Sequence, residues 1–209
     1  VSTRGLRVSC YLNEFTDSID GLVRKWNENV YIGKNGGGIG SYFGGVRSIG
    51  ESVGARGKTS GVIPFIRVMD SLTTAISQAG LRRGAAAVYL PIWHPEVEEF
   101  CEIRKPTGGD PRRKTHDLHH GVAIDDAFMH ALENDEEYNL RSPKTGETVK
   151  TIRARDLWIR ILSARMEQGE PYIIYADTIN KARPEHQKLP GLEAKTPNPT
   201  VAPQTRITT

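Results

Sequence analysis

Short apolar runs alternate with longer amphipathic stretches along most of this chain. Each short run is bounded by Gly, Pro or Asp, which predicts five β-strands: Leu6–Asn13, Gly38–Val46, Ala85–Ile92, Gly121–Ile124 and Tyr172–Tyr175. Between them apolar residues recur at near-helical spacing, which predicts five helices: Ile19–Ile32, Pro64–Ser77, Pro95–Arg104, Asp126–Asn134 and Ala154–Glu167. Strands that alternate with helices in this way indicate a parallel α/β fold.

Capping and turn residues support these boundaries. Asp17 and Ser18 stand directly before the first helix, where a short oxygen-bearing side chain caps backbone N–H groups. Pro64 suits the first turn of the second helix. The segment Leu140–Val149 contains Pro143-Lys144-Thr145-Gly146, which predicts a turn and a small hairpin.

The composition narrows the class of protein. Of the 209 residues, 37% are hydrophobic and 25% are charged, as in a soluble globular protein. No apolar run approaches the ~20 residues of a membrane span, and the first residues do not form a signal peptide, so we expect a cytoplasmic protein without membrane contact. Residues 196–209 contain several prolines and no apolar periodicity, so we expect one domain over residues 1–195 and then an extended tail.

The charge pattern argues against a nucleic-acid partner. The net charge is only +3 and is evenly spread along the chain. The basic cluster Arg112-Arg113-Lys114 has four glutamates near it in the sequence, so we expect it to be solvated surface. These glutamates are Glu96, Glu98, Glu99 and Glu102.

Cysteine and histidine positions give little sign of a metal site. The two cysteines, Cys10 and Cys101, exclude a disulfide scaffold and a four-cysteine zinc site. The histidines His116, His119 and His120 come from one short segment, in which adjacent side chains point to opposite faces of a strand. Asp117 is the one carboxylate in the sequence placed to complete a pocket there, so we expect no metal.

Two glycine-containing segments suggest a bound ligand. Residues 77–87, with the sequence Ser-Gln-Ala-Gly-Leu-Arg-Arg-Gly-Ala-Ala-Ala, combine an amide, two guanidinium groups and two glycines, which suits a planar, anionic ligand. Residues 36–40, Gly-Gly-Gly-Ile-Gly, do not form a dinucleotide fingerprint, because the third glycine of that motif would fall on Phe43. Close approach of the backbone to a substrate explains these glycines better, and tight packing is the alternative.

Four motifs in order resemble the large, catalytic subunit of class I ribonucleotide reductase. They are the segments Ser9–Asn13, Asn35–Tyr42, Ser77–Ala87 and Tyr89–Glu98, and the resemblance covers about residues 3–196. It implies that the five strands are one half of a ten-stranded α/β barrel. It also implies deoxyribonucleotide biosynthesis for DNA replication.

The resemblance assigns residues to two nucleotide sites. From its sequence alone Cys10 is typical of a buried small hydrophobe, but in the resemblance it matches one cysteine of a redox pair that reduces the ribose. Four further residues are implied at the substrate: Ser9, Gly38, Gln78 and Arg82. Five are implied at an allosteric site for a deoxynucleoside triphosphate or ATP, with Asp17 on the deoxyribose hydroxyl and the arginines on the phosphates: Asp17, Ser18, Ile19, Arg47 and Arg56.

The resemblance also implies partners and a radical reaction. A thiyl radical removes a ribose hydrogen, water leaves, and the cysteine pair supplies two electrons. The metal cofactor that generates the radical belongs to a separate small subunit, so no cofactor is expected in this chain. A thioredoxin- or glutaredoxin-type reductant and a homodimer through the first two helices are implied as well.

One difference between this sequence and the family leaves a second interpretation open. The family's Asn-Leu-Cys segment, which carries the radical cysteine, does not occur here. The isolated chain is therefore expected to have no turnover. The alternative is a catalytically silent nucleotide-binding and dimerisation fragment, or one piece of a split reductase. A dinucleotide-dependent oxidoreductase is disfavoured by the failed glycine fingerprint.

Overall fold

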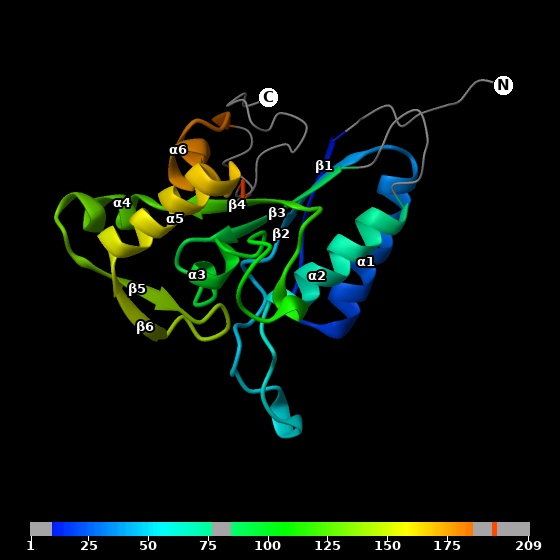
Figure 1. Ribbon diagram of the computed structural model, residues 1–209, viewed down its shortest axis with the longest axis horizontal. Helices are drawn as coiled ribbons and strands as arrows, with labels where there is room; N and C mark the ends of the chain where they lie inside the picture. Colours follow the sequence, from blue (N-terminus) through cyan, green and yellow to red (C-terminus); the bar gives the residue numbers. More distant parts are fainter. Residues whose placement is uncertain (1–9, 77–84, 186–193, 196–209) are drawn as a thin grey trace.

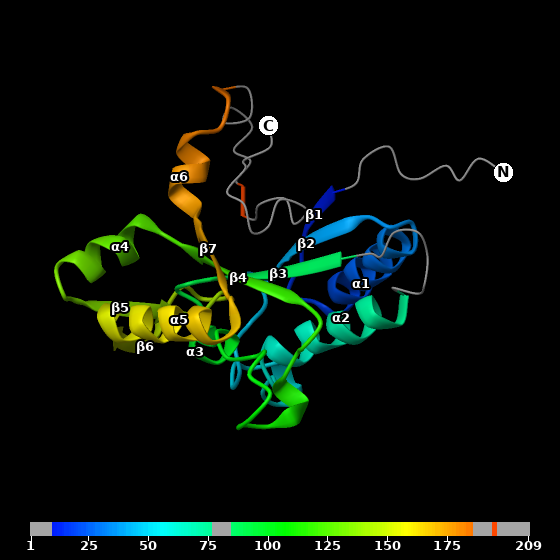
Figure 2. The same cartoon turned by 45° about the horizontal axis from the view of Figure 1, so that its top comes forward.

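The fold is centred on a five-stranded parallel sheet. The computed structural model describes residues 10–76, 85–185 and 194–195. The strands lie in the order β1-β2-β3-β4-β7 (Figure 1; β7 is labelled in Figure 2). Their bounds are Cys10–Glu14, Gly38–Tyr42, Ala85–Pro91, His119–Ile124 and Tyr172–Tyr175. The predicted parallel α/β fold is therefore confirmed.

Helices follow the strands, as the alternating pattern requires. Their bounds are Ile19–Lys34 for α1, Ile63–Ile76 for α2, Val97–Phe100 for α3, Asp126–Glu133 for α4, Ala154–Gln168 for α5 and Ala176–Lys181 for α6. An antiparallel hairpin of β5, Glu137–Arg141, and β6, Thr148–Arg153, stands between α4 and α5. Two 3₁₀ turns, η1 at Gly54–Arg56 and η2 at Pro111–Arg113, lie in loops.

One face of the sheet carries the main core. Alternate residues of a strand point to the same side, so Val88 and Leu90 of β3 lie beside Val122 of β4. All three are fully buried and belong to one apolar cluster with residues of the first five helices. Leu22 of α1 and Ile161 of α5 are members of this cluster. Helices α1 to α5 therefore cover this side, which we call the helix face.

The opposite face carries small residues together with the larger side chains of Tyr42, Tyr89 and Ile174. The register places Gly38 and Ala85 in one row, and Gly121 opposite Tyr89 in another. A Cβ on Gly121 would lie 2.7 Å from Cε1 of Tyr89, so glycine makes room for that ring. We call this side the small-residue face. It packs on Ile179 of α6, which lies across the sheet from α1 and α2 (Figure 2).

A buried polar cluster fixes α1 against the sheet. The Asn13 amide of β1 donates to Oδ1 of Asn29 at 2.7 Å, and the Ser41 hydroxyl of β2 donates to Oδ1 of Asn13 at 2.7 Å. All three side chains are buried, so their mutual hydrogen bonds replace the water that they lose on folding. The cluster sets the register of α1 along β1 and β2.

Several predicted boundaries differ from the structure. The strand expected to reach Val46 ends at Tyr42, where the chain enters turns. The prediction of a helix over Pro95–Arg104 is wrong beyond the single turn of α3. After Phe100 the backbone closes i→i−3 bonds, such as the Ile103 N–H to the Phe100 carbonyl at 3.4 Å. Its apolar residues are buried by a series of turns rather than by one helix face.

Other predicted boundaries agree better with the structure. The predicted hairpin is confirmed, although its arms extend beyond Leu140–Val149. Strand β4 begins two residues before the predicted Gly121, because the histidines join it. Helix α6 has no counterpart among the predicted helices. Within the described ranges no helix is long and apolar enough to span a bilayer.

Candidate functional site

The start of α1 is built by two neighbouring residues with different contacts. Ser18 has an extended backbone, and its hydroxyl accepts a hydrogen bond from the Gly21 N–H at 3.1 Å, so Ser18 is the N-cap. Asp17 instead accepts from Nε of Arg47 at 2.6 Å and from the Arg47 backbone N–H at 3.3 Å. Two residues predicted at the effector site are thus brought together.

Arg47 joins this helix start to the loop that follows β2. Its Nη1 donates to the Ser52 carbonyl at 2.7 Å. The side chains of Asp17 and Arg47 are 25% and 17% exposed, so a ligand could reach them. A guanidinium beside a helix N-terminus can bind phosphate, and the neighbouring carboxylate can accept a sugar hydroxyl.

The remaining predicted effector residues lie nearby in the chain. Ile19 is the first residue of α1, and its side chain is 69% exposed. Arg56 lies in η1, at the far end of the same loop that begins at Arg47. The loop extends away from the body of the molecule as the cyan segment after β2 (Figure 1).

Two of the predicted substrate residues, Cys10 and Gly38, are neighbours at one end of the sheet. Cys10 is paired in register with Gly38, and Gly38 with Ala85. Cys10 is partly exposed and carries a thiol rather than a disulfide. The predicted residues Ser9, Gln78 and Arg82 lie outside the described residues.

The second cysteine has a different environment. Cys101 directly follows α3 as its C-cap and is fully buried in the main core. Burial raises the pKa of its thiol to about 12, so it stays protonated at neutral pH. Cys101 is therefore a core side chain.

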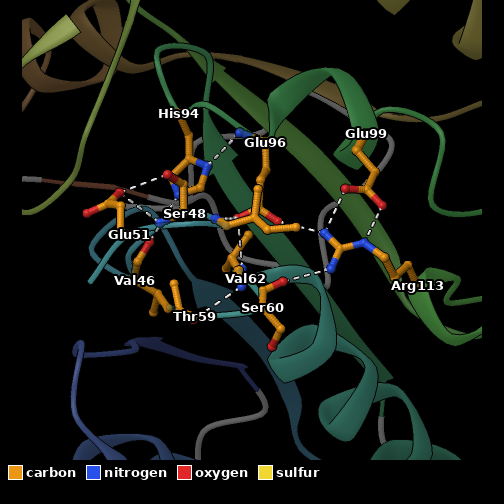
Figure 3. A network of polar contacts seen from close by, with 12 residues as sticks. Val46, Ser48, Glu51, Thr59, Ser60, Val62, His94, Glu96, Glu99 and Arg113 are labelled. Atoms are coloured by element: carbon orange, nitrogen blue, oxygen red, sulfur yellow. Dashed lines mark hydrogen bonds and ion pairs between the residues drawn. The ribbon is translucent and has the colours of Figure 1, made fainter. Parts of the chain in front are cut away.

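A buried glutamate organises the loop that carries Arg47 (Figure 3). Oε2 of Glu96 accepts the Ile49 N–H at 3.0 Å and the Val62 N–H at 2.9 Å. Oε1 accepts from Nη2 of Arg113 at 2.8 Å. Burial raises the pKa of Glu96, while these donors act in the opposite direction.

Arg113 corrects one expectation from the sequence. Its guanidinium binds both oxygens of Glu99, at 2.6 and 2.7 Å, and donates to the Ser60 carbonyl at 2.7 Å. Only 16% of its side chain is exposed, so it is not solvated surface. Arg112, in contrast, is 83% exposed, as predicted for the cluster.

Two further groups hold the same loop. Nε2 of His94 lies 3.0 Å from the Val46 carbonyl, and Nδ1 accepts the Glu96 N–H at 3.1 Å. Burial lowers the pKa of His94 to about 4, so the ring is neutral at physiological pH. Glu51 accepts from the Ser48 N–H at 2.9 Å and from the Ser142 hydroxyl at 2.9 Å, which ties the loop to the β5–β6 hairpin.

The histidine segment has a carboxylate partner that sequence reasoning missed. His119 and His120 both contact Glu170, which lies just before β7. Arg104 donates to the same carboxylate at 2.7 Å. The assumption that only Asp117 could serve these histidines is therefore wrong. In the part of the chain that the structure describes, no group of three or more His, Cys, Asp or Glu is arranged to hold a metal ion.

Comparison with known proteins identifies the relatives of this chain. The family model described as "Ribonucleotide reductase, barrel domain" matches residues 8–191. The chain is 40% identical over 218 residues to the ribonucleoside-diphosphate reductase large subunit of Invertebrate iridescent virus 6, covering 100% of this chain and 22% of that protein. It is 35% identical over 200 residues to ribonucleoside-diphosphate reductase subunit alpha of Helicobacter pylori, covering 84% of this chain and 25% of that protein.

A solved structure agrees with these matches. The class Id ribonucleotide reductase alpha subunit of Actinobacillus ureae superposes with a TM-score of 0.76 at 26% identity, covering 94% of this chain and 32% of that chain. The five-stranded parallel sheet and the match to a barrel-domain model fit the predicted half barrel. The chain spans less than two-fifths of the length of the relatives that it matches.

Proposed function

The chain belongs to the ribonucleotide reductase family, within the barrel domain of the large subunit, and from this we propose that it contributes an effector site and part of the substrate site to the reduction of ribonucleotides. The product is the deoxyribonucleotide used for DNA synthesis. The observation that carries the proposal is the pairing of Asp17 with Arg47 at the start of α1.

The chemistry of that pair suits a deoxynucleoside triphosphate or ATP. Arg47 offers a forked, permanently charged donor set for phosphate oxygens. Asp17 offers an acceptor for a ribose hydroxyl once Arg47 turns towards phosphate. Ser18 and Ile19 begin the helix whose N-terminal N–H groups face the same place. Arg56, at the tip of the loop, adds a second phosphate contact in this proposal.

The substrate site in this proposal lies at the end of the sheet where Cys10 and Gly38 are neighbours. Gly38 lets the substrate approach the backbone, and Ser9, Gln78 and Arg82 contact it from the adjoining segments. Cys10 is one of two thiols that together lose two electrons and two protons and become a disulfide. The ribose C2′ gains hydrogen as its hydroxyl leaves as water.

The other components lie outside the chain. A thiyl radical abstracts the ribose 3′-hydrogen at the start of the reaction and becomes a thiol. At the end that thiol returns a hydrogen to C3′ and is a thiyl radical again. A small subunit with a metal cofactor generates that radical, and a thioredoxin- or glutaredoxin-type protein reduces the disulfide. The cofactor is therefore assigned to the partner and not to residues of this chain.

A dimerisation role has its own support. Ile19, Val23 and Tyr31 recur along one side of α1, and all three are more than half exposed. An apolar stripe of this kind suits a helix of a second copy. The second candidate function is a nucleotide-binding and dimerisation module, or one piece of a split reductase, that is silent by itself.

Calorimetric titration with deoxynucleoside triphosphates tests the proposal. We expect the wild type to bind, and Arg47→Ala to bind more weakly by about 1.5–3 kcal/mol, as for hydrogen bonds to charged groups. Arg112→Ala is the control, because Arg112 is an exposed arginine far along the chain from the site. Equal affinity of the wild type and a folded Arg47→Ala variant would mean that the effector site lies elsewhere.

A further inference from the structure

The loop after β2 forms a two-stranded arm. The Gly50 N–H donates to the Thr59 carbonyl at 3.0 Å, and the Thr59 N–H donates to the Glu51 carbonyl at 2.9 Å. Near the tip, the Val53 N–H donates to the Gly57 carbonyl at 2.8 Å. We call residues 47–62 the effector arm. Arg47 stands at its start and Arg56 in the turn at its tip.

The base of the effector arm is fixed to the body of the molecule by one carboxylate. A single oxygen of Glu96 accepts the N–H of Ile49, on the outgoing strand of the arm, and that of Val62, on the returning strand. Figure 3 shows Glu96 between His94 and the backbone near Val62, with Arg113 on its other side. Glu96 is only 3% exposed, so no water takes the place of these two donors.

The geometry around this carboxylate leaves little room for the arm to shift. Gly61 has φ +90°, and a Cβ on it would lie 2.3 Å from Oε1 of Glu96. Arg113 holds the same oxygen and also donates to the Ser60 carbonyl, so the returning strand is fastened on both sides of Gly61. The outgoing strand is fastened at Val46 by His94 and at Ile49 by Glu96.

We propose that Glu96 is a positioning residue for the effector, because it fixes both strands of the arm whose arginines bind the phosphates. This inference rests on the proposed function. Glu96 itself lies behind the arm and touches no ligand. Its charge, held by Arg113, fixes the base of the arm and so keeps Arg47 within reach of Asp17.

The test separates phosphate binding from the rest of the nucleotide. Dissociation constants of dTTP and dTMP, and of dATP and dAMP, are measured by calorimetry for the wild type and for Glu96→Gln. The glutamine keeps the size of the side chain but loses its charge. We expect the triphosphates to bind about tenfold more weakly, the loss of one charged contact, and the monophosphates to change much less.

The control is Glu98→Gln, a glutamate two positions along the chain that pairs with Lys150 and Arg160 and not with the arm. In this variant the affinities for the triphosphates and for the monophosphates should both stay within about twofold of the wild-type values. Hydrogen exchange adds a direct readout. The amide protons of Ile49 and Val62 should lose protection in Glu96→Gln even without nucleotide, whereas those of β3 should not.

A second variant tests the proposal if Glu96→Gln does not fold. Arg113→Lys keeps the positive charge beside Glu96 but loses the fork that also reaches Ser60, so it should lower the same triphosphate-to-monophosphate ratio. An unchanged ratio in a folded variant, or an equal loss for both kinds of ligand, would overturn the proposal. No nucleotide binding by the wild type would overturn the proposed function and this inference together.

Discussion

Glu170 joins three segments through one side chain at the start of β4 and β7. It is 5% exposed and is contacted by two histidines and by Arg104 of the turns that follow α3. Burial alone would raise its pKa, but the hydrogen bonds from His119, His120 and Arg104 lower it well below the ordinary range. The carboxylate therefore favours the folded state only while it is ionised.

Replacing Glu170 by glutamine should make folding less sensitive to acid. Because the folded-state pKa is lowered, the stabilisation is complete above the ordinary glutamate pKa of about 4.3 and is lost as the pH falls below it. At pH 7 we expect Glu170→Gln to lower the free energy of unfolding by about 1.5–3 kcal/mol. Urea titrations between pH 3 and pH 7 measure both effects.

The difference between Glu170→Gln and the wild type should shrink as the pH falls through the acid range. A difference that is constant from pH 7 to pH 3 would contradict this account. Glu133→Gln is the control, because Glu133 is the last residue of α4 and does not belong to the group formed by Glu170, the two histidines and Arg104.

At the residue scale, the sequence revealed less than the structure. The residue types at the start of α1 predicted a cap. Which of the two residues caps the helix was not predictable, because Asp17 is instead bound by Arg47 and leaves Ser18 as the cap. The contact of Glu170 with His119 joins residues 51 positions apart, and no local pattern announces it. Glu96 did leave a signal, because it is a charged residue between the buried residues Ile92 and Val97.

Helix α1 carries the proposed effector site, so its attachment to the sheet matters at the scale of elements. The amide of Asn29 contacts Asn13 and also lies 3.4 Å from the Ser41 hydroxyl. The helix thus meets β1 and β2 through polar groups as well as through apolar packing. Buried amides have few alternative partners, so they favour one register of the helix.

Asn29→Ala should destabilise the fold by about 1–3 kcal/mol, because it leaves the buried amide of Asn13 without its acceptor. Asn27→Ala is the matched control, since Asn27 is an exposed asparagine of the same helix. That variant should change the free energy of unfolding by less than about 0.5 kcal/mol. Thermal and urea unfolding of both variants make the comparison, and equal stability would show that the buried cluster contributes nothing.

Elements were predictable where burial and periodicity agreed. The strands β3 and β7 are short apolar runs with clear ends, and their predicted bounds differ from the structure by one residue at most. The segment after Glu96 has helical spacing of Val97, Phe100 and Ile103, yet the core accepts these side chains from turns. Spacing alone cannot distinguish a helix from successive turns that bury the same residues.

At the scale of the whole molecule, the small-residue face is the place where chemistry is proposed. Cys10, Gly38 and Gly121 lie on it by register, and α6 covers part of it. Nζ of Lys195 contacts Oε1 of Glu14 at 2.7 Å and lies 5.5 Å from the centre of the Tyr42 ring. The end of the described chain therefore also reaches this face, beside β1.

A polypeptide of these 209 residues alone should show no reductase turnover. The proposed reaction needs a radical thiol and a redox pair, whereas the sequence has two cysteines and Cys101 is buried. Deoxynucleotide formation is measured with a competent small subunit and a dithiol reductant. Turnover that disappears in Cys10→Ser would contradict the prediction, because it would mean that this chain performs the reaction without a third thiol.

The spatial order of the strands has a consequence for how the molecule assembles. From β1 to β4, every strand lies beside the one made just before it, so each pairing closes a loop of modest length. The sheet can therefore grow strand by strand as the chain leaves the ribosome. Only β7 must wait, because the β5–β6 hairpin and α5 are synthesised before it reaches β4. We therefore expect the β4–β7 pairing, with Glu170 at its start, to be the last part of the sheet to gain protection during refolding.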